Sequence, residues 1–447
     1  MRCARWVVNL SRAGQWINRR LAVTKQNHWQ FGSRIRLGAA RVAYAFATVV
    51  LTLVVMTRPA QTQTYTVLLT FNGSDGANPI AGLILDASGN LYGTTFGGGA
   101  LTYGTVFKID KTGGETVLHS FSVGDGAFPS TRLIMGKDGN LYGTALEGSK
   151  GSGVVYKLAR SGKETVLYDF IGGRFNQKPK VPETGLLMDT AGNLYGTTIS
   201  GGISDCSAQG NPYCGTAFKL DSKRKLTILH SFTGGSDGAA PYGSMIMDGA
   251  RNLYGTTYVG GDLNCKQQGE KGCGVVFKLD ASGTETVLHS FTGGADGAFP
   301  LGGGDGLVSD SAGSLYGTAG YGGNFKGGCA VYGCGTVFKL DKSGTFTVLY
   351  TFKGNSDGAQ PNAGLIRDSA GNLYGTTQGG VTNCMYGSVF KLDTAGKLTV
   401  LHVLNGGTDG ANPFGGLVRD SSGKLYGTAY QAFTFFNRVG TVFEITP

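Results

Sequence analysis

The sequence is poor in the patterns that build helices and in the residues that carry most enzyme chemistry. It holds only five His in 447 residues, and the region after residue 65 lacks the 3.6-residue apolar period of an amphipathic helix. We identify no Ser-His-Asp order, paired-carboxylate motif or phosphate-cradling glycine loop. These absences argue against a helical or α/β fold, and we therefore assign no catalytic residue.

Acidic residues are missing from residues 1–60, which hold ten of the 39 Lys and Arg residues. Removing that segment leaves 29 basic and 29 acidic residues, so the formal net charge of +10 comes from the N-terminal segment alone. A formally neutral domain does not have the basic surface of a nucleic-acid-binding protein. We expect no nucleic-acid partner.

The N-terminal segment has the order of a secretory signal. A long basic region precedes the apolar run 42–56, and polar residues 58–62 follow it. The run is shorter than the roughly 20 residues that span a bilayer, which favours a cleaved signal over an uncleaved anchor. We expect residues 1–60 to be an export signal and residues 61–447 to be one domain. Only an uncleaved N-terminal segment would then contact the membrane.

Cysteine is also scarce, but six of the eight residues fall in pairs, each in the same variable stretch of a repeat and just before a Gly. In an exported protein such pairs favour local disulfides. The predicted disulfides are Cys206–Cys214, Cys265–Cys273 and Cys329–Cys334. A zinc site is the weaker alternative, because no His accompanies these cysteines. Cys384 has Tyr386 where a partner would stand and is predicted to be a free thiol.

Glycine, by contrast, is abundant at 78 residues and recurs at fixed places of a tandem repeat. Each unit of roughly 50 to 60 residues holds four short segments rich in Val, Ile, Leu, Phe, Tyr and Thr, which indicate strands. The clearest element is Leu-Tyr-Gly-Thr, whose seven copies begin at Leu91, Leu141, Leu194, Leu253, Leu315, Leu373 and Leu425.

Two connections in each unit are short, as at residues 86–90 and 110–113, and predict β-hairpins. A four-stranded antiparallel unit repeated seven times predicts an all-β fold, the seven-bladed β-propeller. The chain opens with a fourth-strand segment at residues 66–71 and ends with a third-strand segment at residues 440–445. We therefore expect the N-terminal strand to join the last blade and close the ring, which removes open sheet edges. A monomer is expected.

The combination Gly-Asn-Leu-Tyr-Gly-Thr-Thr, Gly-Thr-Val-Phe-Lys-Leu-Asp and Thr-Val-Leu-His-Ser-Phe resembles the GloVer tandem repeat of bacterial choice-of-anchor extracellular proteins. The resemblance covers residues 66–445 and implies an exported bacterial protein without an assigned catalytic residue. Some members of that family are held at the cell surface by a C-terminal sorting segment. This sequence ends at Ile445-Thr446-Pro447 with no hydrophobic tail or basic terminus, which argues against that route.

Most polar residues recur in every copy and suit structural roles. Four of the five His occupy the same place in the predicted fourth strand, the outermost strand of a blade. One series of Asp ends the first strand, and a second lies in the connection Gly-x-Asp-Gly-Ala-x-Pro, where both suit turns. Calcium binding by the second series is a weaker alternative, because one Asp per loop is few for about six to eight oxygen ligands. We predict no metal and no cofactor.

The copies differ most in the connection between the second and third strands, which is long in the third to fifth copies. These loops carry aromatic, amide and basic residues that disulfides would hold in place, a composition suited to binding. Tolerated insertions on a stable ring are the equally weighted alternative. The candidate ligand-binding residues are Asn211, Tyr213, Tyr258, Asn264, Lys266, Tyr321, Asn324, Phe325 and Tyr332.

The sequence thus predicts an exported, non-enzymatic propeller that binds a protein or glycan at or outside the cell envelope. An extracellular propeller lyase or hydrolase acting on polysaccharide or a small polar substrate is the main alternative. A purely structural envelope component is the third. Two or more carboxylates close together at the channel mouth would favour the enzyme, whereas Gly and aliphatic side chains would favour binding or structure.

Overall fold

The computed structural model describes residues 63–446, except for 172–179, 203–213, 303–304, 327–328, 356, 381–385 and 432–438. The predicted export signal and Cys384 lie outside the described residues. Within the described ranges, no helix has the length and apolar character needed to cross a membrane.

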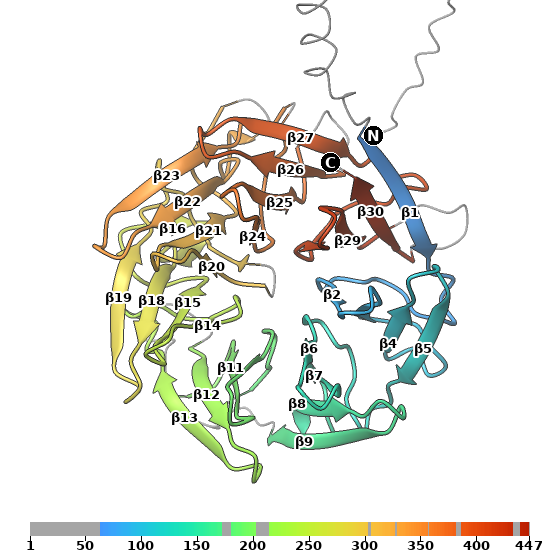
Figure 1. Cartoon of the computed structure of the whole chain (residues 1–447). Coiled ribbons are helices and arrows are strands. Elements are labelled where there is room, and N and C mark those ends of the chain that lie inside the picture. Colours follow the sequence, from blue (N-terminus) through green and yellow to red (C-terminus); the bar gives the residue numbers. More distant parts are fainter. Residues whose placement is uncertain are drawn as a thin grey trace, which may run out of the picture. The chain divides into compact units, whose positions relative to one another are not determined.

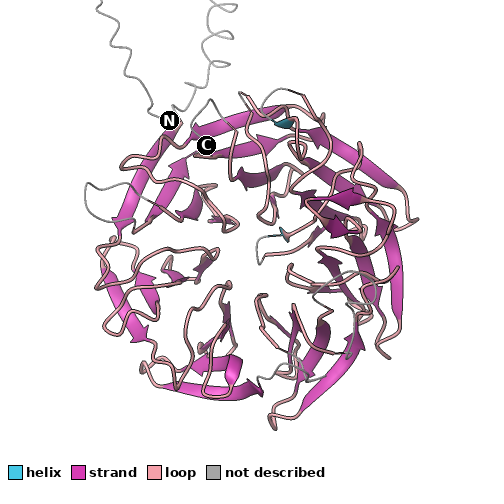
Figure 2. Cartoon of the chain, turned by 180° about the vertical axis from the view of Figure 1, so that it is seen from behind, coloured by secondary structure: helices cyan, strands magenta, loops and turns pink. Residues whose placement is uncertain are grey.

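Seven four-stranded antiparallel sheets surround a central axis, which confirms the predicted seven-bladed β-propeller (Figure 1). In each blade the first strand lies nearest the axis and the fourth forms the outer edge, while the connections gather around the centre (Figure 2). Blades one to three are β2 (Ile84–Leu85), β3 (Leu91–Thr95), β4 (Thr105–Ile109), β5 (Glu115–Ser120); β6 (Ile134–Met135), β7 (Leu141–Ala145), β8 (Gly151–Leu158), β9 (Glu164–Ile171); β10 (Leu187–Met188), β11 (Leu194–Thr198), β12 (Thr216–Leu220) and β13 (Leu226–Ser231).

The remaining four blades follow the same order from the axis outwards. They are β14 (Ile246–Met247), β15 (Leu253–Thr257), β18 (Val275–Leu279), β19 (Glu285–Ser290); β20 (Val308–Ser309), β21 (Leu315–Ala319), β22 (Thr336–Leu340), β23 (Phe346–Thr351); β24 (Ile366–Arg367), β25 (Leu373–Thr377), β26 (Ser388–Leu392), β27 (Leu398–Val403); β28 (Val418–Arg419), β29 (Leu425–Ala429), β30 (Thr441–Thr446) and β1 (Thr64–Thr70).

The seventh blade combines both ends of the domain. Strand β1 pairs antiparallel with β30, with Thr64 opposite Thr446 and Thr70 opposite Thr441. The sheet order β1-β30-β29-β28 makes the N-terminal strand the outer edge of the last blade. The predicted closure of the ring is therefore confirmed (Figure 1).

The Gly of Leu-Tyr-Gly-Thr makes room for an aromatic ring of the neighbouring third strand. A Cβ atom at Gly93 would lie 2.6 Å from the ring of Phe107, and the equivalent distance is 2.5 to 2.8 Å in every blade. The ring of Phe107 also meets Phe71 of the preceding blade edge to face, with centroids 5.1 Å apart. Such pairs, each adding about 1 kcal/mol beyond burial, recur at five further blade interfaces; the sixth blade has Leu404 in place of the Phe.

Both Asp series have the structural contacts that turns require. In the first, Asp86 Oδ1 accepts hydrogen bonds from the backbone N–H groups of Ser88 and Asn90, and Tyr92 donates its hydroxyl to Oδ2 at 3.1 Å. In the second blade Gly136 interrupts the series, and Asp138 accepts the hydroxyl of Tyr142 at 3.2 Å instead. The repeated Tyr is thus a partner of the hairpin turn.

The four His of the fourth strands each contact the Asp of the following connection. The Nε2 to Oδ2 distances are 3.1 to 3.5 Å, at His119–Asp125, His230–Asp237, His289–Asp296 and His402–Asp409. Tyr350 substitutes for His in the sixth blade and donates to Asp357 at 2.7 Å. These pairs lie on the outer side of the ring and fasten each fourth strand to the connection that follows it.

A carboxyl group at the start of some fourth strands lies against the His–Asp pair of the preceding blade. Burial, opposed by His230 and reinforced by Asp237, raises the pKa of Glu285 from 4.5 to about 7. Its Oε1 has no hydrogen-bond partner within the described part of the chain. Near neutral pH this interface therefore confines a partly charged carboxyl group.

The connection that leads into the first strand is longer in the fifth blade than in the other six. Between Pro300 and Leu307 the chain has residues 301–306, whereas other blades have three residues between the equivalent positions, such as 80–82 in the first blade. The insertion brings Asp305 onto the channel axis. A Cβ atom at Gly82 or Gly364, in two other blades, would lie 2.8 or 2.7 Å from its side chain.

Asp305 forms an ion pair across the channel with Arg132 of the second blade. Its Oδ1 lies 3.3 Å from a guanidinium nitrogen of Arg132, and its Oδ2 accepts a hydrogen bond from the N–H of Gly416 at 2.6 Å. Arg132 also donates from Nε to the carbonyl of Leu83 at 3.1 Å. The side chain of Asp305 is 6% exposed and that of Arg132 is 32% exposed. Blades one, two, five and seven are therefore connected through the centre.

Replacing Arg132 with Ala should lower the free energy of unfolding by about 2 kcal/mol, because it leaves the buried carboxylate of Asp305 without its cation. The double variant R132A/D305N should recover most of this loss, since the amide oxygen still accepts from Gly416 without carrying charge. Denaturant unfolding of wild type, R132A, D305N and R132A/D305N measures both effects. Losses that simply add in the double variant would contradict the cross-channel pair.

The raised pKa of Glu285 predicts a pH dependence of stability. The folded protein holds this proton to a higher pH than the unfolded chain does, so stability should decline as pH rises from 4.5 to about 7. Glu285→Gln should match wild type at pH 5 and melt about 1 to 2 °C higher at pH 8, allowing for solvent screening. Melting curves measure the shift, with the exposed Glu147→Gln as control. Equal melting of E285Q and wild type at both pH values would contradict it.

Candidate binding site at the mouth of the channel

Two of the three predicted disulfides are present in the described residues. Cys265–Cys273 and Cys329–Cys334 bridge Cα atoms 5.8 Å and 5.1 Å apart. Cys214 is also disulfide-bonded, and its predicted partner Cys206 lies outside the described residues. In the fourth blade the bridged loop forms a small hairpin of β16 (Lys266–Gln267) and β17 (Glu270–Lys271).

The predicted loop residues have differing surroundings. Asn211 and Tyr213 lie outside the described residues, while Asn264, Lys266, Phe325 and Tyr332 are exposed and Tyr258, Tyr321 and Asn324 are half-buried. The amide of Asn264 donates to Asp262, and that of Asn324 accepts from the N–H of Lys326. These two amides thus serve the turns of their own loops. The assignment of all nine residues to a ligand site stays a prediction.

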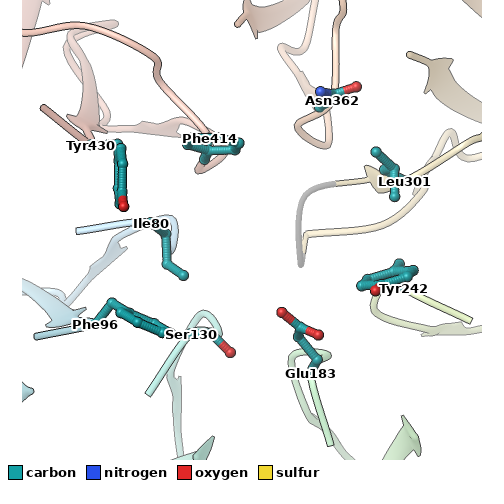
Figure 3. A pocket seen from close by; sticks show the side chains of 9 residues that line it. All are labelled: Ile80, Phe96, Ser130, Glu183, Tyr242, Leu301, Asn362, Phe414 and Tyr430. Carbon is teal, nitrogen blue, oxygen red and sulfur yellow. The ribbon is translucent and has the colours of Figure 1, made fainter. Parts of the chain in front are cut away.

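A cavity of about 400 Å³ opens where the connections between blades reach the axis (Figure 3). Seven of its lining residues share one repeat position, directly after the Pro that precedes each first strand, and the other two follow the second strands of the first and seventh blades. The lining residues are Ile80, Phe96, Ser130, Glu183, Tyr242, Leu301, Asn362, Phe414 and Tyr430. Each blade therefore contributes one side chain from the position after the Pro, and these seven side chains all differ.

A strained backbone conformation aims this position at the axis. The residue before the Pro has a positive φ of 51° to 59° in all seven blades, although none of the seven is Gly. Such a conformation costs about 1 to 3 kcal/mol, and here two backbone hydrogen bonds hold it. The N–H of Asn78 donates to Val439 of the seventh blade at 2.8 Å, and its carbonyl accepts from Phe96 at 3.0 Å. The strained residue thus connects neighbouring blades and directs the next side chain inward.

Three of the lining residues, Ser130, Glu183 and Asn362, are polar and not aromatic. Burial raises the pKa of Glu183 to about 6, and its carboxyl group faces the open centre (Figure 3). Ser130 Oγ and Asn362 Oδ1 are buried and have no hydrogen-bond partner among the described residues. Asn362 donates its Nδ2 to Gln378 at 2.6 Å, so its amide orientation leaves the oxygen unpaired. Both oxygens are shielded from solvent, and Asn362 Oδ1 lies where a Cβ atom at Gly320 would be. The carboxyl group of Glu183 is therefore the polar group that the cavity offers to a ligand.

Aromatic rings form the rest of the wall. Phe414 meets Tyr430 edge to face at 5.5 Å, and Phe96 stacks on Phe128 at 5.0 Å. On the opposite side an aromatic row leads from the cavity to the disulfide loop of the fifth blade, with ring centroids 4.6 to 6.1 Å apart. The row consists of Tyr242, Tyr258, Phe299, Tyr321 and Tyr332.

The row joins three of the predicted loop residues, Tyr258, Tyr321 and Tyr332, to the mouth. Sequence reasoning missed the mouth itself, although one signal was present: a position that differs in all seven copies beside a Pro that recurs in all seven. Of the nine lining residues, Glu183 is the only one with a charged side chain. Within the described residues, no group of three or more His, Cys, Asp or Glu could hold a metal ion.

Three solved structures are similar to this chain. The extracellular domain of a one-component system from B. thetaiotaomicron is 10% identical, with a TM-score of 0.49, and the match covers 85% of this chain and 39% of that chain. The extracellular domain of a hybrid two-component system from the same organism is 12% identical, with a TM-score of 0.48, coverage being 86% and 41%. A gluconolactonase from Xanthomonas campestris is 12% identical, with a TM-score of 0.39, coverage being 70% and 86%.

This chain thus spans about two fifths of the length of the first two proteins. No curated protein sequence matches it significantly. The sequence model of the Gloeobacter/Verrucomicrobia repeat matches residues 53–209, 206–332 and 327–447, and so covers the whole propeller. The resemblance carried by the repeated motifs is therefore confirmed, and this chain belongs to the Gloeobacter/Verrucomicrobia repeat family.

Proposed function

We propose that this protein is an exported binding module that holds a small ligand, or the end of a glycan or protein chain, in the cavity at the mouth of its channel. One observation carries the proposal. A single repeat position, held by the same strained turn in every blade, presents seven different side chains around a cavity of about 400 Å³. This volume is within the range of small-ligand sites.

Variation at this position supports binding over a purely structural role. The residues that build blades recur from copy to copy because every blade needs the same turns and the same aromatic contact. If the residues at the mouth served packing alone, they too would be similar in all seven blades. Seven different side chains instead make the lining asymmetric, with Glu183 and Ser130 on one side and Phe414 and Asn362 on the other, which suits recognition of one orientation of a ligand (Figure 3).

The lining also suits binding better than hydrolysis or elimination. A lyase or hydrolase generally needs an acid and a base, or a metal, around the reacting bond. The mouth supplies one carboxylate, Glu183, in a wall that is otherwise neutral. Disulfides in the loops of neighbouring blades are the pattern of an exported protein. The aromatic row offers further contact to a ligand that extends beyond the cavity.

The site predicts a matched pair of effects on binding. Phe414→Ala and Tyr242→Ala should each weaken binding of any oligosaccharide or oligopeptide selected from an array by about tenfold, because each removes one aromatic wall. Ile228→Ala, an exposed residue of the outer strand β13, should leave binding unchanged. Calorimetry with the selected compound measures the affinities, and circular dichroism checks folding. Full affinity in both mouth variants, or no binding by wild type, would contradict the proposed site.

A further inference from the structure

The nine described residues that line the mouth cavity include one acidic side chain and no basic one. Glu183 offers a carboxylate, while the buried oxygens Ser130 Oγ and Asn362 Oδ1 have no partner among the described residues. One N–H of the Asn362 amide donates to Gln378. The described lining residues include no Lys, Arg or His. The ionised carboxylate of Glu183 only accepts hydrogen bonds, so a ligand that pairs with it must bring a donor of its own.

The placement of the carboxyl group adds a preference for positive charge. Glu183 comes from the third blade, flanked at the mouth by Ser130 of the second and Tyr242 of the fourth (Figure 3). Burial raises its pKa to about 6, so it is mainly ionised at neutral pH although it is poorly solvated. A cation in the cavity would relieve that cost, and the electron-rich faces of aromatic rings attract cations as well.

We propose that the mouth cavity recognises a protonated amine carried by a small, otherwise uncharged ligand. The ammonium group donates to the carboxylate of Glu183, and the carbon frame of the ligand packs against Tyr242, Phe414 and Tyr430. This inference rests on the proposed function, since it names the chemistry of the ligand that the same cavity holds.

Two matched pairs of compounds test the inference on the whole propeller. The first is benzylamine against benzyl alcohol, and the second is glucosamine against N-acetylglucosamine. Calorimetry at pH 7 should show the amine of each pair binding at least tenfold more tightly than its neutral partner. Glu183→Gln should remove that difference while leaving the affinity for the neutral partner unchanged. The exposed Glu147→Gln is the control for a change of net charge and should bind as wild type does.

A second readout separates a direct ion pair from a general effect of the substitution. Amine binding should weaken between pH 7 and pH 5 in wild type, because Glu183 takes up a proton over this range. The other titratable residues of the lining are Tyr242 and Tyr430. In Glu183→Gln the affinity should not change between these pH values.

The outcomes distinguish this inference from the proposed function. If neutral partners bind as tightly as amines, and Phe414→Ala weakens them while Glu183→Gln does not, the cavity binds ligands but the preference for amines is wrong. If amines bind tightly and Glu183→Gln has no effect, the proposed contact is wrong. If no compound of either pair binds, the inference falls, and the proposed function is then judged by the array experiment alone.

Discussion

The fold depends above all on the contact between the aromatic residue of each third strand and the residue at the end of the fourth strand of the preceding blade, a Phe at six of the seven interfaces and Leu404 at the other. This contact explains why Gly stands in Leu-Tyr-Gly-Thr, because a Cβ atom there would collide with the ring. It also fixes how closely neighbouring blades approach one another, as between Phe71 and Phe107. With the spacing of blades set by buried rings, the seven side chains that line the channel mouth need not contribute to holding the ring together. The scaffold is thereby separated from the residues that can vary for function.

At the strained residue before each Pro, too, the backbone serves the scaffold while the side chain is free to vary. Its backbone hydrogen bonds span two blades, and its side chain can be as different as those of Asn78, Phe128 and Val181. The residue after the Pro therefore points towards the cavity in every blade, whichever side chain it carries. Glu183, Tyr242 and Phe414 therefore occupy equivalent places although their chemistry differs. In the fifth blade the same position is followed by the insertion that carries Asp305, so one site is adapted both by substitution and by added length.

Much of the fold could be predicted because each of its elements recurs in seven copies of the repeat. The hairpin turns, the number of blades and the closure by β1 all follow from recurrence of short local patterns, and the loop cysteines reveal their bridges by close spacing. The mouth could not be found this way, since residues such as Ser130 and Asn362 are far apart in sequence and line one cavity only because the ring closes. In the third copy either Pro179 or Pro182 could be aligned with the Pro of the other copies, so the sequence does not show that Glu183 occupies the variable position. The pair of Arg132 and Asp305 was missed because the glycines around Asp305 resemble those of ordinary turns. The loop prediction identified Tyr258, Tyr321 and Tyr332, but only the structure connects them to the axis.

Closure of the ring by β1 and β30 has a consequence for the order of folding. The first strand to be synthesised finds its partner only in the last one, so nearly the entire domain separates the two halves of the seventh blade. Contacts of such long range are slow to form, and the entropy of closing the loop is spent before they contribute. A chain that is still being synthesised therefore carries an incomplete last blade with an unpaired edge. Strand β30 completes the seventh blade by pairing with β1, so the ring closes only once the final residues are free to pair.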